Sequence, residues 1–337
     1  MEQALTMNGV MDNESVRAGR QSGFHRALDS LRQPGIVFSL RKATADAELP
    51  MEGELDIWLD PRSIPAADAA LARAGFHYFS APGQGRHRFY LSFEEGRWFK
   101  LDAKLRKEDG SETDRAGLAG PRERLRARLG RRRLAGIRRR GPVVAVLGPD
   151  GAGKGSVVAS LQRSIPVAVT AVYLGFGRSR SPEPRDPSAP GEVMPSRPGA
   201  ILETAFILRK AIRCWKRLLP AYLAAWRGHI VLCDRHPIEV LAVRPDRTKP
   251  ARAIERFIAS RLVPRPDATI LLDAPGEILF RRKGEHPVEV LERWRRSYAE
   301  VFVPLGATVV ATTGPPRAAV AQASEVVWRA LRRRRGW

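Results

Sequence analysis

The chain has few cysteines, which limits the kinds of site it can build. Cys214 and Cys233 are the only two among 337 residues, and they lack the paired spacing of metal ligands. Residues 1–30 also lack the apolar core of a signal peptide. We therefore expect free thiols in a reducing compartment and predict a cytoplasmic location.

Acidic residues are also scarce. Lysine and arginine total 58 against 36 aspartates and glutamates, which gives a formal charge of +22. Such an excess favours polyanionic partners: nucleotides, nucleic acid or an anionic membrane surface. The alternative is an arginine-biased composition with solvated faces. With 43% hydrophobic residues, the chain is long and apolar enough for two globular domains.

Long apolar runs are missing as well. The most apolar helical stretch, 200–226, is interrupted by basic residues and a proline, so no transmembrane segment is predicted. The interrupting residues are Arg209, Lys210, Arg213, Lys216, Arg217 and Pro220. An interfacial helix lying on a membrane stays open for this stretch.

The segment 109–141 changes character and is predicted to be a basic linker. Its part 122–141, RERLRARLGRRRLAGIRRRG, holds ten arginines and one acid, with no aromatic residue between them. It is either a solvated spacer or a patch for nucleic acid or anionic lipid. No nucleic-acid-binding motif is recognisable, so nucleic acid is not the expected partner.

Residues 1–20 are polar and are predicted to be a flexible terminus.

Strands and helices alternate in residues 142–337. Strand-type runs occupy 143–148, 168–175, 229–234, 268–274 and 307–312, with helical stretches between them. This alternation predicts an α/β domain whose parallel sheet is covered by helices on both faces. Residues 21–108 predict a smaller α/β domain, with helices at 23–33 and 65–75 and strands at 35–40 and 54–60. A hairpin of 87–93 and 97–105 would close through Glu94-Glu95-Gly96.

A glycine-rich stretch follows the first strand of the larger domain. GPDGAGKGS, residues 148–156, fits G-x-x-x-x-G-K, with Gly155 between Lys154 and the hydroxyl of Ser156. Such a loop turns backbone N–H groups and a helix N-terminus toward a phosphate. The lysine reaches the terminal phosphates, and the hydroxyl holds Mg²⁺. The binding positions predicted for ATP are Gly148, Asp150, Gly151, Ala152, Gly153, Lys154, Gly155 and Ser156.

Four motifs in order resemble thymidylate kinases, P-loop nucleoside monophosphate kinases, over about residues 142–330. They are the loop 148–156, HIVLCDRH at 229–236, RPDATILLDAPGEILFRRKGEH at 265–286 and VLERWRRSYAEVF at 290–302. The resemblance implies ATP-dependent phosphoryl transfer with Mg²⁺. It implies that Asp150 faces the acceptor's sugar and that Asp234 lies beside Mg²⁺.

Basic residues complete the roles that the resemblance implies. Arg235 would clamp a phosphate, and Arg281 and Arg282 would close over the γ-phosphate as a lid together with Lys283. No serine, histidine or cysteine constellation for nucleophilic catalysis is present, and phosphoryl transfer needs mainly positioning and charge. A homodimer stays open, because the sequence carries no interface signature.

The acceptor is left open by one departure from the family pattern. The family carries an Arg-Glu-Pro-Gly-Gly type motif after its second strand, where this chain has LGFGRSRSPEPRDPSAPG at 174–191. A nucleoside monophosphate, with dTMP and ATP giving dTDP and ADP, is the first expectation. A sugar or glycan precursor as acceptor, or an ATP-binding scaffold or switch without transfer, are the alternatives.

Three carboxylates in the smaller domain suggest a second metal site. Glu54 and Asp56 alternate on one strand and so share a face, and Asp102 lies on a later strand. This pattern resembles the nucleotidyltransferase fold, whose acids hold Mg²⁺ for nucleotidyl transfer. The glycine-serine turn of that fold is replaced by SLRKATADAELPMEG at 39–53. An active transferase, a degenerate regulatory or docking domain and an unrelated α/β domain all stay open.

Overall fold

The computed structural model describes residues 23–41, 49–80, 87–106, 140–175, 200–242 and 248–337. It divides into two compact units: unit 1 holds the described residues up to Arg106, and unit 2 those from Arg140 onward. The predicted flexible terminus 1–20 lies outside the described residues, as do 109–139 of the predicted linker. Arg140 and Gly141 belong to unit 2, because Arg140 pairs with Asp267 and the Gly141 N–H donates to the Ala225 carbonyl.

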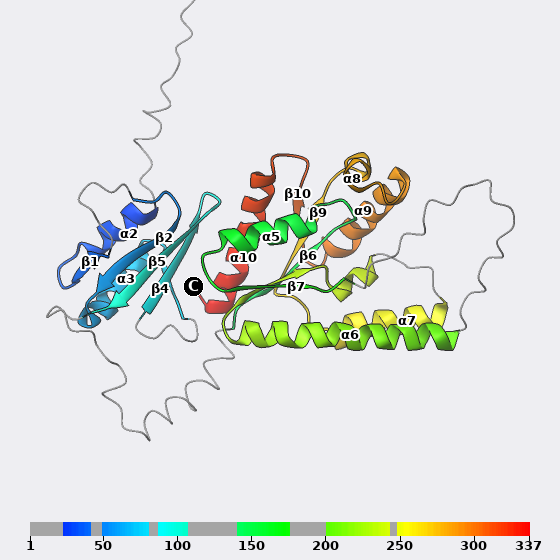
Figure 1. Ribbon diagram of the computed structural model, residues 1–337, viewed down its shortest axis with the longest axis horizontal. Coiled ribbons are helices and arrows are strands. Elements are labelled where there is room, and N and C mark those ends of the chain that lie inside the picture. Colours follow the sequence, from blue (N-terminus) through cyan, green and yellow to red (C-terminus); the bar gives the residue numbers. More distant parts are fainter. Residues whose placement is uncertain (1–22, 42–48, 81–86, 107–139, 176–199, 243–247) are drawn as a thin grey trace, which may run out of the picture. The chain divides into compact units, whose positions relative to one another are not determined.

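Unit 1 is a mixed five-stranded sheet with two helices, in the order β1-β2-β5-β4-β3 (Figure 1). Its elements are α2 (Gly23–Leu31), β1 (Phe38–Leu40), β2 (Gly53–Leu59), η1 (Pro61–Ser63), α3 (Ile64–Arg73), β3 (His77–Phe79), β4 (His87–Glu94) and β5 (Arg97–Leu105). The predicted helices, strands and hairpin are confirmed, although β1 is shorter than expected. Strand β3, which pairs with β4, was not predicted.

The hairpin between β4 and β5 shows why its sequence was readable. Glu94 pairs with Arg97, so the loop is only Glu95 and Gly96. Both have positive φ angles, 49° and 80°, which a two-residue turn matching the strand twist requires. The core beneath the sheet includes Phe24, Phe76 and Phe99, whose rings pack edge to face or tilted.

Unit 2 contains a five-stranded, all-parallel sheet in the order β10-β9-β6-β8-β7. The strands are β6 (Val143–Leu147), β7 (Val169–Tyr173), β8 (Ile230–Asp234), β9 (Ala268–Asp273) and β10 (Thr308–Ala311). All five predicted strands are confirmed. Every residue of β6 is buried, as expected for a central strand covered on both faces.

Helices lie on both faces of this sheet (Figure 1). They are α5 (Lys154–Ser164), α6 (Ala200–Trp226), α7 (Lys249–Phe257), α8 (Gly276–Lys283), α9 (Val288–Phe302) and α10 (Pro316–Arg335), with short turns η2 (Pro237–Leu241) and η3 (Ile258–Leu262). Alternate β6 residues point to one face, where Val143 packs with α6 and Leu147 with α9. Helices α5 and α10 contact each other and cover the opposite face.

The chain leaves β6 through α5 on one face and leaves β8 and β9 through helices on the other. Open parallel sheets bind ligands where such connections diverge, beyond the carboxyl ends of the strands. The glycine-rich loop lies at this position, between the ends of β8 and β9. Among the described residues, no helix is long and apolar enough to cross a membrane.

Candidate functional site

The glycine-rich loop between β6 and α5 is built on three glycines with positive φ angles. Gly148, Gly151 and Gly153 have φ angles of 144°, 87° and 84°. A Cβ on Gly148 would lie 2.6 Å from the Leu272 carbonyl oxygen, and one on Gly151 would lie 2.5 Å from that of Leu279. The loop therefore requires glycine for backbone conformation and for close contact with β9 and α8.

Helix α5 begins directly after this loop, at Lys154, so its first-turn N–H groups face the loop's concave side. Gly155 and Ser156 in that turn are exposed. A helix N-terminus with exposed N–H groups is suited to bind an anion. Ala152, by contrast, is buried and fixes the loop through packing.

Lys154 is buried, with 7% of its surface exposed. Its Nζ donates hydrogen bonds to the carbonyls of Gly148 at 2.7 Å and Pro149 at 2.8 Å. Burial, with help from the nearby Arg235 charge, lowers the pKa of Lys154 to about 8. The acids Glu239, Asp150 and Asp234 act in the opposite direction. The loop thus holds the Lys154 ammonium group at its centre, and the charge of that group depends on the charged side chains around it.

Asp150 gathers three cations around the loop. Its carboxylate hydrogen-bonds the Arg235 guanidinium and lies 3.8 Å from the Nζ atoms of both Lys154 and Lys283. Burial alone would raise the pKa of Asp150, but Arg235 and the two lysines outweigh burial and lower it. Asp150 therefore holds three cations at the loop, and two of them, Arg235 and Lys283, also pair with Glu239 and Glu285.

Arg235 follows β8 and has a positive φ of 67°, one of two such non-glycine residues among those described. This conformation costs about 1–3 kcal/mol and is found at functional sites. The Arg235 N–H donates to the Val146 carbonyl, and its Nη1 lies 3.5 Å from the Glu239 carboxylate. The Glu239 contact helps to hold the partly exposed guanidinium beside Asp150.

Glu239 and Tyr298 are buried neighbours of Arg235. Tyr298 hydrogen-bonds the Glu239 carboxylate. Burial raises the pKa of Glu239 even though Lys154 and Arg235 act against it. Sequence reasoning missed both residues, because they lie on η2 and α9 and are brought together only by the fold.

Asp234 ends β8 beside the first turn of α5. A Cβ built on Gly155 would lie 3.5 Å from its Oδ2 atom. Burial raises the pKa of Asp234, while the charges of Lys154 and Arg235 oppose that shift. The carboxylate and the exposed Ser156 hydroxyl come from neighbouring elements and offer the oxygen ligands that Mg²⁺ prefers. The donor chemistry of this corner therefore fits the metal expected from the sequence.

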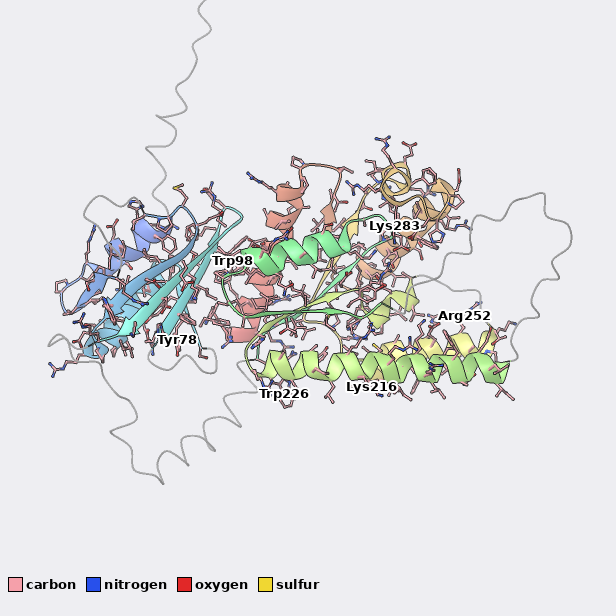
Figure 2. The ribbon with its side chains drawn as sticks, viewed as in Figure 1. Tyr78, Trp98, Lys216, Trp226, Arg252 and Lys283 are labelled. Atoms are coloured by element: carbon pink, nitrogen blue, oxygen red, sulfur yellow. The ribbon has the colours of Figure 1, made fainter. Side chains whose placement is uncertain are left out.

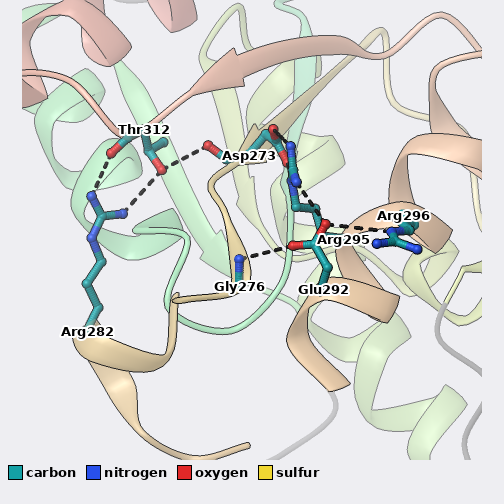
Figure 3. A network of polar contacts seen from close by, with 7 residues as sticks. All are labelled: Asp273, Gly276, Arg282, Glu292, Arg295, Arg296 and Thr312. Atoms are coloured by element: carbon teal, nitrogen blue, oxygen red, sulfur yellow. Dashed lines mark hydrogen bonds and ion pairs between the residues drawn. The ribbon is translucent and has the colours of Figure 1, made fainter. Parts of the chain in front are cut away.

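The three basic residues at the end of α8 have different positions. Lys283 lies near Asp150 and forms an ion pair with Glu285 at 2.9 Å. Arg282 instead donates to Thr312 beyond β10, through Nη1 to Oγ1 at 3.2 Å and Nη2 to the carbonyl at 2.6 Å (Figure 3). Arg281 is exposed. The structure thus brings Lys283 to the loop and fixes Arg282 at the edge of the sheet.

Figure 3 also shows the contacts of Asp273, the last residue of the neighbouring strand β9. Asp273 accepts two hydrogen bonds from Arg295, at 2.6 and 3.0 Å, and Arg295 also contacts Glu292 at 2.9 Å. Glu292 accepts from the Gly276 N–H at 3.1 Å, at the start of α8. The Asp273 carboxylate is therefore already bound to Arg295 of α9. Glu292, also on α9, caps the N-terminus of α8.

Gly284 ends α8 with a φ of 65° and turns the chain back toward the loop. Glu285 and His286, which follow, have side-chain ligand atoms within 4.8 Å of each other and of Asp150. The His286 ring also packs edge to face on Trp294, with centroids 4.6 Å apart. Sequence reasoning did not place His286 at the site, because no local pattern links it to Asp150.

The acidic residues of unit 1 form a separate cluster. Asp56 and Asp102 are paired neighbours on the parallel strands β2 and β5, and with Glu54 their oxygens lie within 4.8 Å of one another. Each carboxylate already has a basic partner: Lys100 with Glu54 at 2.8 Å, Arg41 with Asp56 at 3.5 Å and His87 with Asp102 at 2.7 Å. The predicted grouping is present, and each of its carboxylates is paired with a basic side chain.

Comparison with known proteins adds no relative to these observations. No family model matches the chain, and no curated protein sequence matches it at a significant level of similarity.

Proposed function

We propose that unit 2 is an ATP-dependent phosphotransferase whose acceptor is a small molecule, with a nucleoside monophosphate as the first candidate. The observation that carries this proposal is the glycine cradle at the end of a central parallel strand, with the buried Lys154 at its centre. Backbone N–H groups, a helix N-terminus and a lysine converge there, which is the combination that binds a polyphosphate. The resemblance to thymidylate kinases points to the same chemistry.

The residues around the cradle divide the work by their position. Lys154 and the first turn of α5 bind the phosphates of ATP. Ser156 and Asp234 would hold Mg²⁺, which neutralises charge on the transferring group when bound. Arg235 is already aimed by Glu239 and binds the transferring or acceptor phosphate. Lys283 offers a further positive charge from α8.

Asp150 has a defined place in this proposal. It keeps Arg235 and Lys283 close to the loop through ion pairs, and a phosphate would compete with it for both cations. An acidic residue in such a loop also suits hydrogen bonding to acceptor hydroxyl groups, as the family resemblance implies. A positioned set of cations that changes partner during the reaction is what phosphoryl transfer requires.

The test is ADP release from the purified full chain with Mg-ATP in the presence of different acceptors. Nucleoside monophosphates including dTMP come first, followed by sugars and sugar phosphates. Stimulation by dTMP alone identifies a thymidylate kinase activity, and stimulation by another compound identifies a kinase with a different acceptor. ATP binding without stimulation by any acceptor would contradict the transfer reaction and leave an ATP-binding scaffold or switch.

A further inference from the structure

Helix α6 carries an exposed apolar stripe that no described element of unit 2 covers. Its members recur every three, four or seven positions, which places them on one side of the helix. They are Ile201, Leu208, Ile212, Trp215, Leu219, Leu223 and Trp226, with exposed fractions from 38% at Trp215 to 86% at Ile201. The opposite side of α6 is buried on the sheet through Cys214, Leu218 and Ala221.

The stripe borders a groove between α6 and α7. The groove has a volume of about 550 Å³ and is lined by Leu208, Trp215 and Leu219 from α6. Phe257 and Leu262 from the other wall are 57% and 49% exposed. Single exposed apolar side chains are ordinary on protein surfaces, but a contiguous patch of this kind indicates an interaction surface.

Positive charges flank the apolar stripe on both sides. On α6, Arg209, Arg213, Lys216 and Arg217 form an adjacent exposed row. Exposed Lys249, Arg256 and Arg261 come from α7 and η3. Figure 2 labels Lys216 and Trp226, which show the two kinds of side chain on this one helix.

Acidic residues do not reach this surface. The two acids in α6, α7 and η3 are Glu203 and Glu255, and both are buried. Glu203 accepts hydrogen bonds from the Thr248 N–H and hydroxyl, and Glu255 binds Lys210 at 3.1 Å. The exposed charge along α6, α7 and η3 is therefore of one sign.

We propose that this α6–α7 surface docks on the headgroup region of an anionic lipid bilayer. The apolar stripe would enter the boundary between headgroups and acyl chains, and the flanking cations would contact lipid phosphates. A second copy of the chain would bring like charges against like charges, and nucleic acid would leave the stripe in water. Trp215 and Trp226 suit the interface, because an indole has an apolar body and a polar N–H.

The experiment measures binding of the full chain to lipid vesicles by flotation. Vesicles of phosphatidylcholine alone are compared with an equal mixture of phosphatidylcholine and phosphatidylglycerol. We expect binding only to the anionic vesicles, weakening as salt rises. Tryptophan emission should shift to shorter wavelength on binding, and Trp226→Phe should reduce that shift.

Substitutions within the α6–α7 surface test whether vesicle binding comes from this surface or from the arginines of 122–141. Leu219→Gln is expected to weaken partition about tenfold, because one buried leucine is lost from the interface. Lys216→Gln and Arg213→Gln are each expected to weaken it about fivefold. The matched controls Leu305→Gln, at an exposed leucine after α9, and Arg317→Gln, at an exposed arginine of α10, should bind like the wild type.

Three results would overturn the proposal. The first is no binding to either kind of vesicle, and the second is wild-type binding by both Leu219→Gln and Lys216→Gln. The third is a chain that is dimeric by light scattering, becomes monomeric on Leu219→Gln and ignores vesicles. That outcome would assign the stripe to a contact between two copies.

Discussion

The loop site of unit 2 and the acidic face of unit 1 both gather charged side chains, but they offer different backbone groups to a ligand. Around the loop, Arg235, Lys154 and Lys283 all lie near Asp150, and Arg235 and Lys283 also pair with Glu239 and Glu285. On the face of unit 1, three carboxylates have three basic partners. Counting ion pairs therefore does not separate the two regions, because acidic and basic side chains already bind one another in both of them.

Their places in the fold do separate the two regions. The loop lies beyond the carboxyl ends of parallel strands, where backbone N–H groups of α5 are exposed. Glu54, Asp56 and Asp102 lie within the paired strands β2 and β5, whose backbone groups are used in the sheet. Of the two regions, only the loop therefore supplies backbone donors to a ligand, and this difference supports the proposal that unit 2 binds the nucleotide.

The largest effect is expected from removing the cation at the centre of the loop. Lys154→Ala should lower ATP turnover by at least about a hundredfold, since a positioned charge acting on the phosphates is lost. Steady-state ADP release measures this, with circular dichroism to check the fold. Lys283→Ala is the matched control: its side chain is 44% exposed, and a smaller loss is expected there. Equal turnover in Lys154→Ala and the wild type would refute the site.

The next effect concerns the shape of the cradle. Gly151 and Gly153 both have positive φ, but a Cβ meets the Leu279 backbone only at Gly151. Gly153→Ala should destabilise unit 2 by about 1 kcal/mol through backbone strain alone. Gly151→Ala should cost about 3 kcal/mol, because the contact with α8 adds to that strain. Thermal unfolding compares the two variants, and equal losses would contradict the contact.

A smaller effect should appear in the pH dependence of ATP binding. Burial lowers the pKa of Lys154 to about 8, so the free loop loses its charge as pH rises through that value. In the proposed site ATP would bind the ammonium form, so binding above about pH 8 would take up a proton. Affinity for Mg-ATP should therefore fall toward tenfold per pH unit there, as calorimetric titration would show. An affinity that stays level between about pH 7 and about pH 9 would contradict this role for Lys154.

Much of the fold was predictable because its signals are local. Five apolar runs separated by helical stretches indicate the strands of unit 2, and Glu95-Gly96 indicates the hairpin of unit 1. Strand β3 was missed because three residues, His77–Phe79, are too few to show a period. Its pairing with β4 depends on the tertiary fold.

The site was predictable only where its residues are close in sequence. The loop 148–156 and the Asp234-Arg235 pair carry their own patterns. Glu239, Tyr298 and His286 come to the loop from separate elements, and nothing in their local sequence indicates it. Arg282 shows a different limit. The basic run 281–283 predicts a charged end of a helix, but it does not indicate which of its residues will contact Thr312.

The smallest effect on ATP turnover is expected from a change in unit 1. This change tests whether the acidic face takes part in ATP chemistry. Asp102 is buried and bound to His87, so Asp102→Asn should destabilise unit 1 by about 1–3 kcal/mol through the weakened pair. It should change ATP turnover by less than about twofold, because an amide there removes no group from the loop of unit 2. ADP release by Asp102→Asn is measured beside Lys154→Ala under the same conditions. A loss comparable to that of Lys154→Ala, in a variant that remains folded, would show that the acidic face takes part in ATP chemistry, and the exposed backbone donors of the loop would then not distinguish the two regions.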